Sequence, residues 1–163
     1  MIVIGINSFS QEEEKVSKHA IGLAAGVSTG YGLSYQYTPI EKLTFQLAFA
    51  PLKDENRTEI STGLTFIYRI KEGEKLNFFV YQANHYLVSR RTEYTYEYNQ
   101  FTMQYEQNGP TTVNNDRFNN GLGLGFEFFV GKNVLLNLMG GYGARNNFKE
   151  LGLTGEIGLF YKL

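Results

Sequence analysis

From Lys18 to the C-terminus, large apolar residues alternate with small or polar residues at a period of two. This is the period of a β-strand whose two faces differ. The clearest stretch begins at Gly121 and places Leu122, Leu124 and Phe126 on one face and Gly125 on the other. The pattern predicts an all-β chain, since an amphipathic helix would repeat at 3.6 residues.

The same period predicts eight strands, separated by turn residues or by polar connections. We expect them at residues 19–28, 31–38, 42–50, 59–70, 75–91, 117–130, 133–144 and 150–163. The tight turns are at residues 38–42, 71–75 and 131–133, and the longer polar connections are at 51–58, 92–116 and 145–149. Short turns therefore gather at one end and long connections at the other, which is the layout of transmembrane β-barrels.

The two faces of the strands indicate which side of the barrel meets lipid. The bulky face carries residues such as Tyr31, Leu33 and Phe49, whereas the opposite face carries small or polar residues such as Gly22 and Gln46. A narrow eight-stranded barrel has room inside only for the second set, so we expect the bulky face outside. The alternative is a soluble, lipocalin-like barrel that binds a small ligand, with the bulky face inside.

Composition removes several other classes of protein. The 163 residues favour one domain, and a net charge of -1 gives no general attraction for nucleic acid. The chain has no Cys and only two His, His19 and His85, so thiolate metal sites and thiol nucleophiles are excluded. We predict no nucleic-acid partner, no metal site and no cofactor.

The first residues differ from the rest. Residues 1–10 form an apolar run that closes in Ser8-x-Ser10, a pattern typical of the end of a signal peptide. We interpret residues 1–10 as a signal-peptide remnant and residues 11–17 as a flexible tail. The alternatives are a frayed N-terminal extension or an additional edge strand.

The strand count, the alternating connections and the closing segment Leu153–Leu163 resemble the small eight-stranded outer-membrane barrels, the family of the outer membrane protein A transmembrane domain and outer membrane protein X. The resemblance covers residues 18–163. It implies an antiparallel up-and-down transmembrane β-barrel in the outer membrane of a Gram-negative bacterium, with outer-membrane lipid and the assembly machinery as partners. The family usually ends in an aromatic residue, whereas this chain ends in Leu163.

The residues offer little catalytic equipment. His85 and Ser89 lie on one predicted strand about 13 Å apart, too far to form a dyad. We therefore assign no catalytic residue, and an outer-membrane enzyme acting on lipid or peptide stays an alternative. Arg69, Glu127 and Glu156 share the inward face, and we expect them to form a charge network that fills the lumen.

The long connection 92–116 is the most informative candidate for interaction. It continues the period of two and carries the aromatic residues Tyr94, Tyr96, Tyr98, Phe101 and Tyr105. The strands on either side are expected to extend beyond the membrane as a hairpin whose edge adds a strand from another protein. In the alternative, the aromatic side chains only pack on one another. Our leading hypothesis is a non-enzymatic barrel with a structural or surface-interaction role.

Overall fold

The computed structural model describes residues 17–94, 96–99, 104–107 and 109–163. The predicted signal-peptide remnant 1–10, and all but the last residue of the predicted tail 11–17, lie outside the described residues. Within the described part of the chain, no helix is long and apolar enough to cross a membrane.

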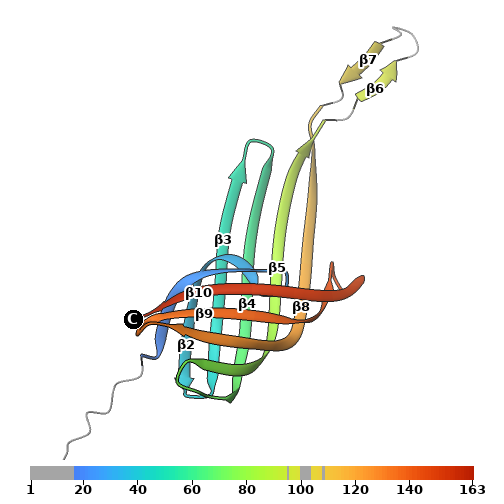
Figure 1. The fold of residues 1–163 in the computed structure, drawn as a ribbon. Coiled ribbons are helices and arrows are strands. Elements are labelled where there is room, and N and C mark those ends of the chain that lie inside the picture. Colours follow the sequence, from blue (N-terminus) through green and yellow to red (C-terminus); the bar gives the residue numbers. More distant parts are fainter. Residues whose placement is uncertain (1–16, 95, 100–103, 108) are drawn as a thin grey trace, which may run out of the picture.

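Eight antiparallel strands close into a barrel (Figure 1). They are β1 (His19–Gly26), β2 (Gly30–Ile40), β3 (Leu43–Asp54), β4 (Arg57–Lys71), β5 (Leu76–Glu93), β8 (Thr111–Val130), β9 (Val134–Arg145) and β10 (Glu150–Lys162). Each strand pairs with its neighbours in this order, and β10 pairs with β1 to close the ring. The predicted eight-stranded up-and-down barrel is confirmed. A short hairpin, β6 (Tyr96–Asn99) and β7 (Gln104–Gln107), joins β5 to β8.

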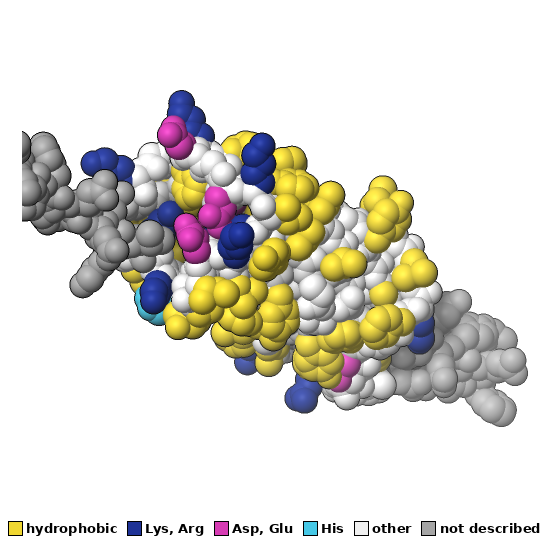
Figure 2. All heavy atoms as spheres, turned by 90° about the horizontal axis from the view of Figure 1, so that it is seen from below, with side chains coloured by type: hydrophobic (Ala, Val, Ile, Leu, Met, Phe, Trp, Pro, Cys, Tyr) yellow, Lys and Arg dark blue, Asp and Glu magenta, His cyan; other side chains and the backbone are white. Residues whose placement is uncertain are grey.

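The outer wall carries the large apolar side chains. On β8 the outward side chains are exposed, at 65% for Leu122, 51% for Leu124 and 44% for Phe126. Gly125 and Glu127, which lie on the opposite face of the same strand, are buried. In Figure 2, apolar side chains cover much of the wall, and most of the charged side chains in view lie toward one end. The predicted assignment of the two faces is confirmed along this strand.

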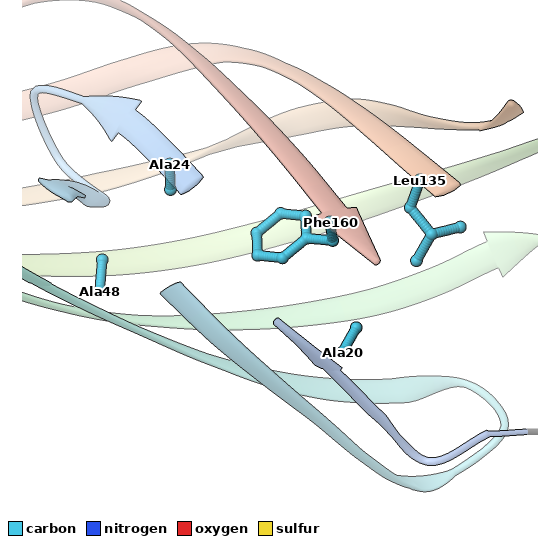
Figure 3. Close-up of a cluster of buried hydrophobic side chains, with 5 residues drawn as sticks. All are labelled: Ala20, Ala24, Ala48, Leu135 and Phe160. Atoms are coloured by element: carbon cyan, nitrogen blue, oxygen red, sulfur yellow. The ribbon is translucent and has the colours of Figure 1, made fainter. Parts of the chain in front are cut away.

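The lumen is filled by side chains. One buried cluster joins Ala20, Ala24, Ala48, Leu135 and Phe160 (Figure 3). A second contains Ile67, Phe79, Tyr81, Ala83 and Met139. Inward glycines make room for these rings, because a Cβ at Gly125 would lie 2.4 Å from the Phe79 ring and one at Gly158 2.5 Å from the Phe160 ring. The alternation of glycine with large residues in the sequence is thus explained by the width of the barrel.

Two connections predicted as polar loops are largely strand. β3 and β4 continue to a tight turn after Asp54, and β5 and β8 stay paired from Leu76↔Phe128 to Glu93↔Thr111. Four strands, β3, β4, β5 and β8, therefore extend beyond the rest of the barrel (Figure 1). The prediction that the strands flanking 92–116 extend as a hairpin is confirmed, and the loop predicted at 51–58 is wrong because its polar residues pair in register.

The turn between β1 and β2 folds into the lumen. Ser28 and Thr29 are fully buried, and Gly30 and Gly32 have φ angles of 77° and 118°. These left-handed conformations favour glycine and bend the chain inward. They also carry Tyr31 over the lumen, where its hydroxyl donates to Glu59 at 3.4 Å. The prediction that Tyr31 faces outward is therefore wrong.

The inserted turn has space only because residue 63 is glycine. A Cβ at Gly63 would lie 1.8 Å from the Thr29 carbonyl oxygen, whereas one at Gly155 would meet nothing within 4 Å. We predict that Gly63→Ala lowers the free energy of unfolding by about 1–3 kcal/mol, because the turn must shift. Urea titration of the folded protein measures this value. Gly155→Ala is the matched control and should stay close to wild type; equal effects of the two substitutions would contradict the packing.

Candidate functional site

The described residues hold a buried ion pair near the end of the barrel where β1 begins and β10 ends. Arg69 of β4 donates from Nε to Glu127 Oε1 at 3.0 Å and from Nη2 to Oε2 at 3.2 Å. Asn77 Nδ2 donates to the same carboxylate at 2.8 Å, and Arg69 Nη1 donates to the Glu41 carbonyl oxygen at 2.7 Å. Both charges are thus paired and hydrogen-bonded, as burial requires.

Glu156, the third residue of the predicted network, lies elsewhere. It stands opposite Gly26 at the far end of β1, and its carboxylate accepts from the backbone N–H of Ser28 at 3.3 Å and from the Ser28 hydroxyl. Among the described residues no cation lies within ion-pair distance of it. The structure therefore brings Arg69 and Glu127 together and leaves Glu156 to hold the inserted turn.

The ion pair lines a cavity of about 230 Å³ that opens at this end of the barrel. The cavity is also lined by the charged residues Lys18, Glu72 and Lys162 and by the apolar side chain of Leu135. Charges of both signs surround it, and its most deeply buried groups already bond one another. The paired side chains of Arg69, Asn77 and Glu127 thus occupy the lumen at the inner end of this cavity.

His85 takes part in a second polar cluster, which the sequence did not reveal. Its Nδ1 lies 2.8 Å from the carbonyl oxygen of Val27, and its Nε2 lies 3.0 Å from the hydroxyl of Ser61. Because the carbonyl can only accept, Nδ1 carries the proton and Nε2 accepts from Ser61. His85 thus links β5 to both β4 and the inserted turn.

This Ser–His contact has part of the geometry of a hydrolytic dyad. The Ser61 hydroxyl oxygen also accepts from the Tyr31 backbone N–H at 3.1 Å, and Ser61 is fully buried. Neither of the two hollows described in the molecule is lined by Ser61 or His85. The contact joins β4, β5 and the inserted turn. The partner of His85 is not Ser89 of its own strand but Ser61 of β4, two residues before Gly63, the register partner of His85. A contact between two strands depends on their register, which the spacing within one strand does not give.

Four of the five aromatic residues predicted in the long connection are described, and three of these lie on β6 and β7. Tyr94 follows β5 and is 47% exposed. Tyr98 of β6 is the register partner of Tyr105 of β7, and Tyr96 pairs with Gln107. Phe101 lies outside the described residues.

The outer edge of β8 is only partly covered. Asn147, in a turn whose residues 146–148 all have positive φ, exchanges hydrogen bonds with the backbone of Phe118 at 2.9 Å and donates to the Asp116 carbonyl oxygen at 3.1 Å. Pairing with β9 begins at Asn120. Residues 111–115 therefore have no strand on this side in the described part of the chain.

Among the described residues, no group of three or more His, Asp or Glu side chains is placed to hold a metal ion. The features that remain as candidates for function are the polar side chains in the lumen and the extension of β3, β4, β5 and β8 beyond the ring.

The closed ring of eight antiparallel strands, with polar side chains inside and apolar side chains outside, defines the fold of the small outer-membrane β-barrels. Among solved structures, the chain is similar to the N-terminal β-barrel domain of Pseudomonas aeruginosa OprF, with 13% identity over 88% of this chain and 93% of that one and a TM-score of 0.53. No protein-family model and no curated protein matches the sequence.

Two further solved structures are similar at lower scores. Neisserial surface protein A has 18% identity over 89% of this chain and 94% of that one, with a TM-score of 0.46. Ail of Yersinia pestis, solved in complex with the heparin analogue sucrose octasulfate, has 14% identity over 87% of this chain and 93% of that one, with a TM-score of 0.39.

The ion pair in the lumen yields a prediction. Glu127→Gln keeps an acceptor for Asn77 but leaves the Arg69 guanidinium without an anion, so we expect the free energy of unfolding to fall by about 3 kcal/mol. Adding Arg69→Met to Glu127→Gln removes the uncompensated charge and should recover part of this loss. Urea unfolding of wild type, Glu127→Gln, Arg69→Met and the double variant measures the coupling. Additive losses would mean that the pair does not interact.

Proposed function

We propose that this protein is a non-enzymatic β-barrel of the outer membrane of a Gram-negative bacterium, with a surface-interaction role. Its exposed large apolar side chains, such as Leu153 at 72% and Leu159 at 52%, support a wall that meets lipid. A soluble lipocalin-like barrel would need an apolar interior, yet Gln46, Glu127 and Asn137 are almost fully buried in this lumen. Outer-membrane lipid and the assembly machinery are then its partners in the membrane.

The direction of insertion follows from the two ends of the barrel. The short turns after β2, β4 and β8 lie at the end of the barrel where β1 begins and β10 ends, and the extended strands leave the other end. In outer-membrane barrels the short turns are periplasmic and the longer connections are extracellular. By this rule we expect the four-stranded extension of β3, β4, β5 and β8 to lie outside the cell, within reach of other proteins.

The single observation that carries the interaction role is the difference between the two edges of this extension. The β3 edge is protected by Pro51, Lys53 and Asp54, because proline lacks an N–H and charges discourage pairing. The β8 edge at residues 111–115 reads Thr-Thr-Val-Asn-Asn, with no charge and no proline. We infer that this edge accepts an extended segment of a partner protein as an additional strand.

The test uses the direction of the backbone groups. Phe118 and Asp116 bond the turn beyond the edge, so even-numbered residues of β8 direct their N–H and C=O groups outward. Asn114→Pro removes one outward N–H while sparing the ladder to β5, and Asn114→Ala is its matched control. Peptides selected on the folded wild-type barrel from a random displayed library are the probes. We expect them to bind Asn114→Ala normally and Asn114→Pro at least about tenfold more weakly.

Deleting residues 93–114 and closing the gap with a short turn should abolish peptide binding while the barrel stays folded, because the deleted backbone lies beyond the ring. Retention of the shift in gel mobility between unheated and boiled samples reports the folded barrel. Peptide binding that survives the deletion, or that is unchanged in Asn114→Pro, would contradict the role of the edge. Hydrolysis of lipid or peptide that is lost in His85→Ala would favour the enzyme instead.

A further inference from the structure

Three amide side chains interrupt the apolar outer wall. Gln82 and Asn84 of β5 and Asn120 of β8 occupy outward positions and are half-buried. Gln82 is flanked in register by Phe66 and Leu122, which are apolar and outward-facing. If the wall meets lipid, as proposed above, these amides face hydrocarbon, where polar groups without partners are costly and mark functional sites.

The amides bond one another but retain free hydrogen-bonding groups. Gln82 Nε2 donates to Asn84 Oδ1 at 3.0 Å and to the Ala83 carbonyl oxygen at 3.4 Å, and its Oε1 accepts from Asn84 Nδ2 at 3.2 Å. Asn120 Nδ2 donates to Asn84 Oδ1 at 2.8 Å. Each amide nitrogen carries two hydrogens. One N–H of Asn84, one N–H of Asn120 and the Oδ1 of Asn120 therefore have no partner among the described residues.

An apolar groove begins beside Gln82 and continues across the wall toward the short-turn end. It has a volume of about 170 Å³ and is lined by the side chains of Leu43, Phe66, Tyr68, Val80, Gln82 and Leu122. Leu122, at 65% exposure, and Tyr68, at 49%, stand out beside it. The wall thus has a narrow apolar groove, and beyond the Gln82 end of this groove lie the uncharged hydrogen-bond donors of Asn84 and Asn120 and the acceptor of Asn120.

We propose that this wall binds a lipid whose acyl chain carries a hydroxyl group, with the hydroxyl on Asn84 and Asn120 and the hydrocarbon in the groove. A hydroxyl both donates and accepts, so it satisfies Asn120 Oδ1 together with one of the free N–H groups. An ester carbonyl only accepts and would leave Asn120 Oδ1 without a partner. A second copy of this chain would set one groove against another and leave a void, whereas a single chain fills the slot.

The sequence contains no Trp, so a single introduced Trp reports on its own lipid neighbours. Leu124→Trp places the reporter on β8 beside the groove without replacing a lining residue. Leu33→Trp places the control on β2, on the opposite side of the ring. Each protein is folded into phosphatidylcholine vesicles whose brominated acyl chains quench Trp fluorescence. Phosphatidylcholine with either a hydroxylated or a plain acyl chain of equal length is then added as competitor.

We expect the hydroxylated chain to relieve quenching at position 124 at about fivefold lower mole fraction than the plain chain, and both to act equally at position 33. Adding Asn84→Leu and Asn120→Leu should abolish the preference while the barrel still folds, as judged by gel mobility.

Equal competition at position 124 in the otherwise unaltered protein would overturn this proposal alone. Relief of quenching that rises with the ratio of protein to lipid, and that the two Leu substitutions remove, would assign the patch to a second copy and overturn it as well. Absence of quenching at both positions would overturn the membrane location and, with it, the lipid site.

Discussion

The pairing of β1 with β10 is the constraint on which the rest of the structure depends. Seven register pairs, from Ala20↔Lys162 to Gly26↔Glu156, turn an open sheet into a closed ring. Closure removes the two edges of the sheet within the ring and gives every strand one face in a narrow lumen. Most large apolar side chains then have room only on the outside, and the rings that do lie inside, such as Phe79 and Phe160, are opposed by inward glycines. The inverted distribution of polar and apolar residues follows from the width of the ring.

The narrow lumen also explains why its polar groups are arranged as they are. A charge inside must find a partner within the same layer, because water is largely displaced by side chains. Arg69 and Glu127 meet this condition through one another, and Glu156 meets part of it through Ser28 of the inserted turn. The inserted turn is also held by His85, which accepts a hydrogen bond from the Ser61 hydroxyl and donates one to the Val27 carbonyl oxygen. The conformation of the β1–β2 turn therefore depends on the side chains that pack in the lumen.

The sequence predicts the parts of this fold that depend on a period within one strand. The eight strands and the outward placement of Leu122 and Leu124 follow from alternation alone. Side-chain contacts between strands cannot be predicted in the same way, because they depend on the register of the strands around the whole ring. The Ser61–His85 contact joins two strands, and the separation of Glu156 from Arg69 results from their positions toward opposite ends of the barrel. Tyr31 departs from its predicted face because Gly30 and Gly32 bend the chain.

The central claim is that alternate residues of each strand meet lipid, and photolabelling from within the bilayer tests it most directly. The folded wild-type protein would be placed in vesicles whose acyl chains carry a diazirine, irradiated, and mapped residue by residue by mass spectrometry. The account predicts labels on Leu122, Leu124 and Phe126, which face outward, and none on Gly123, Gly125 and Glu127, which face the lumen. Labels spread over both sets, or absent from both, would contradict it.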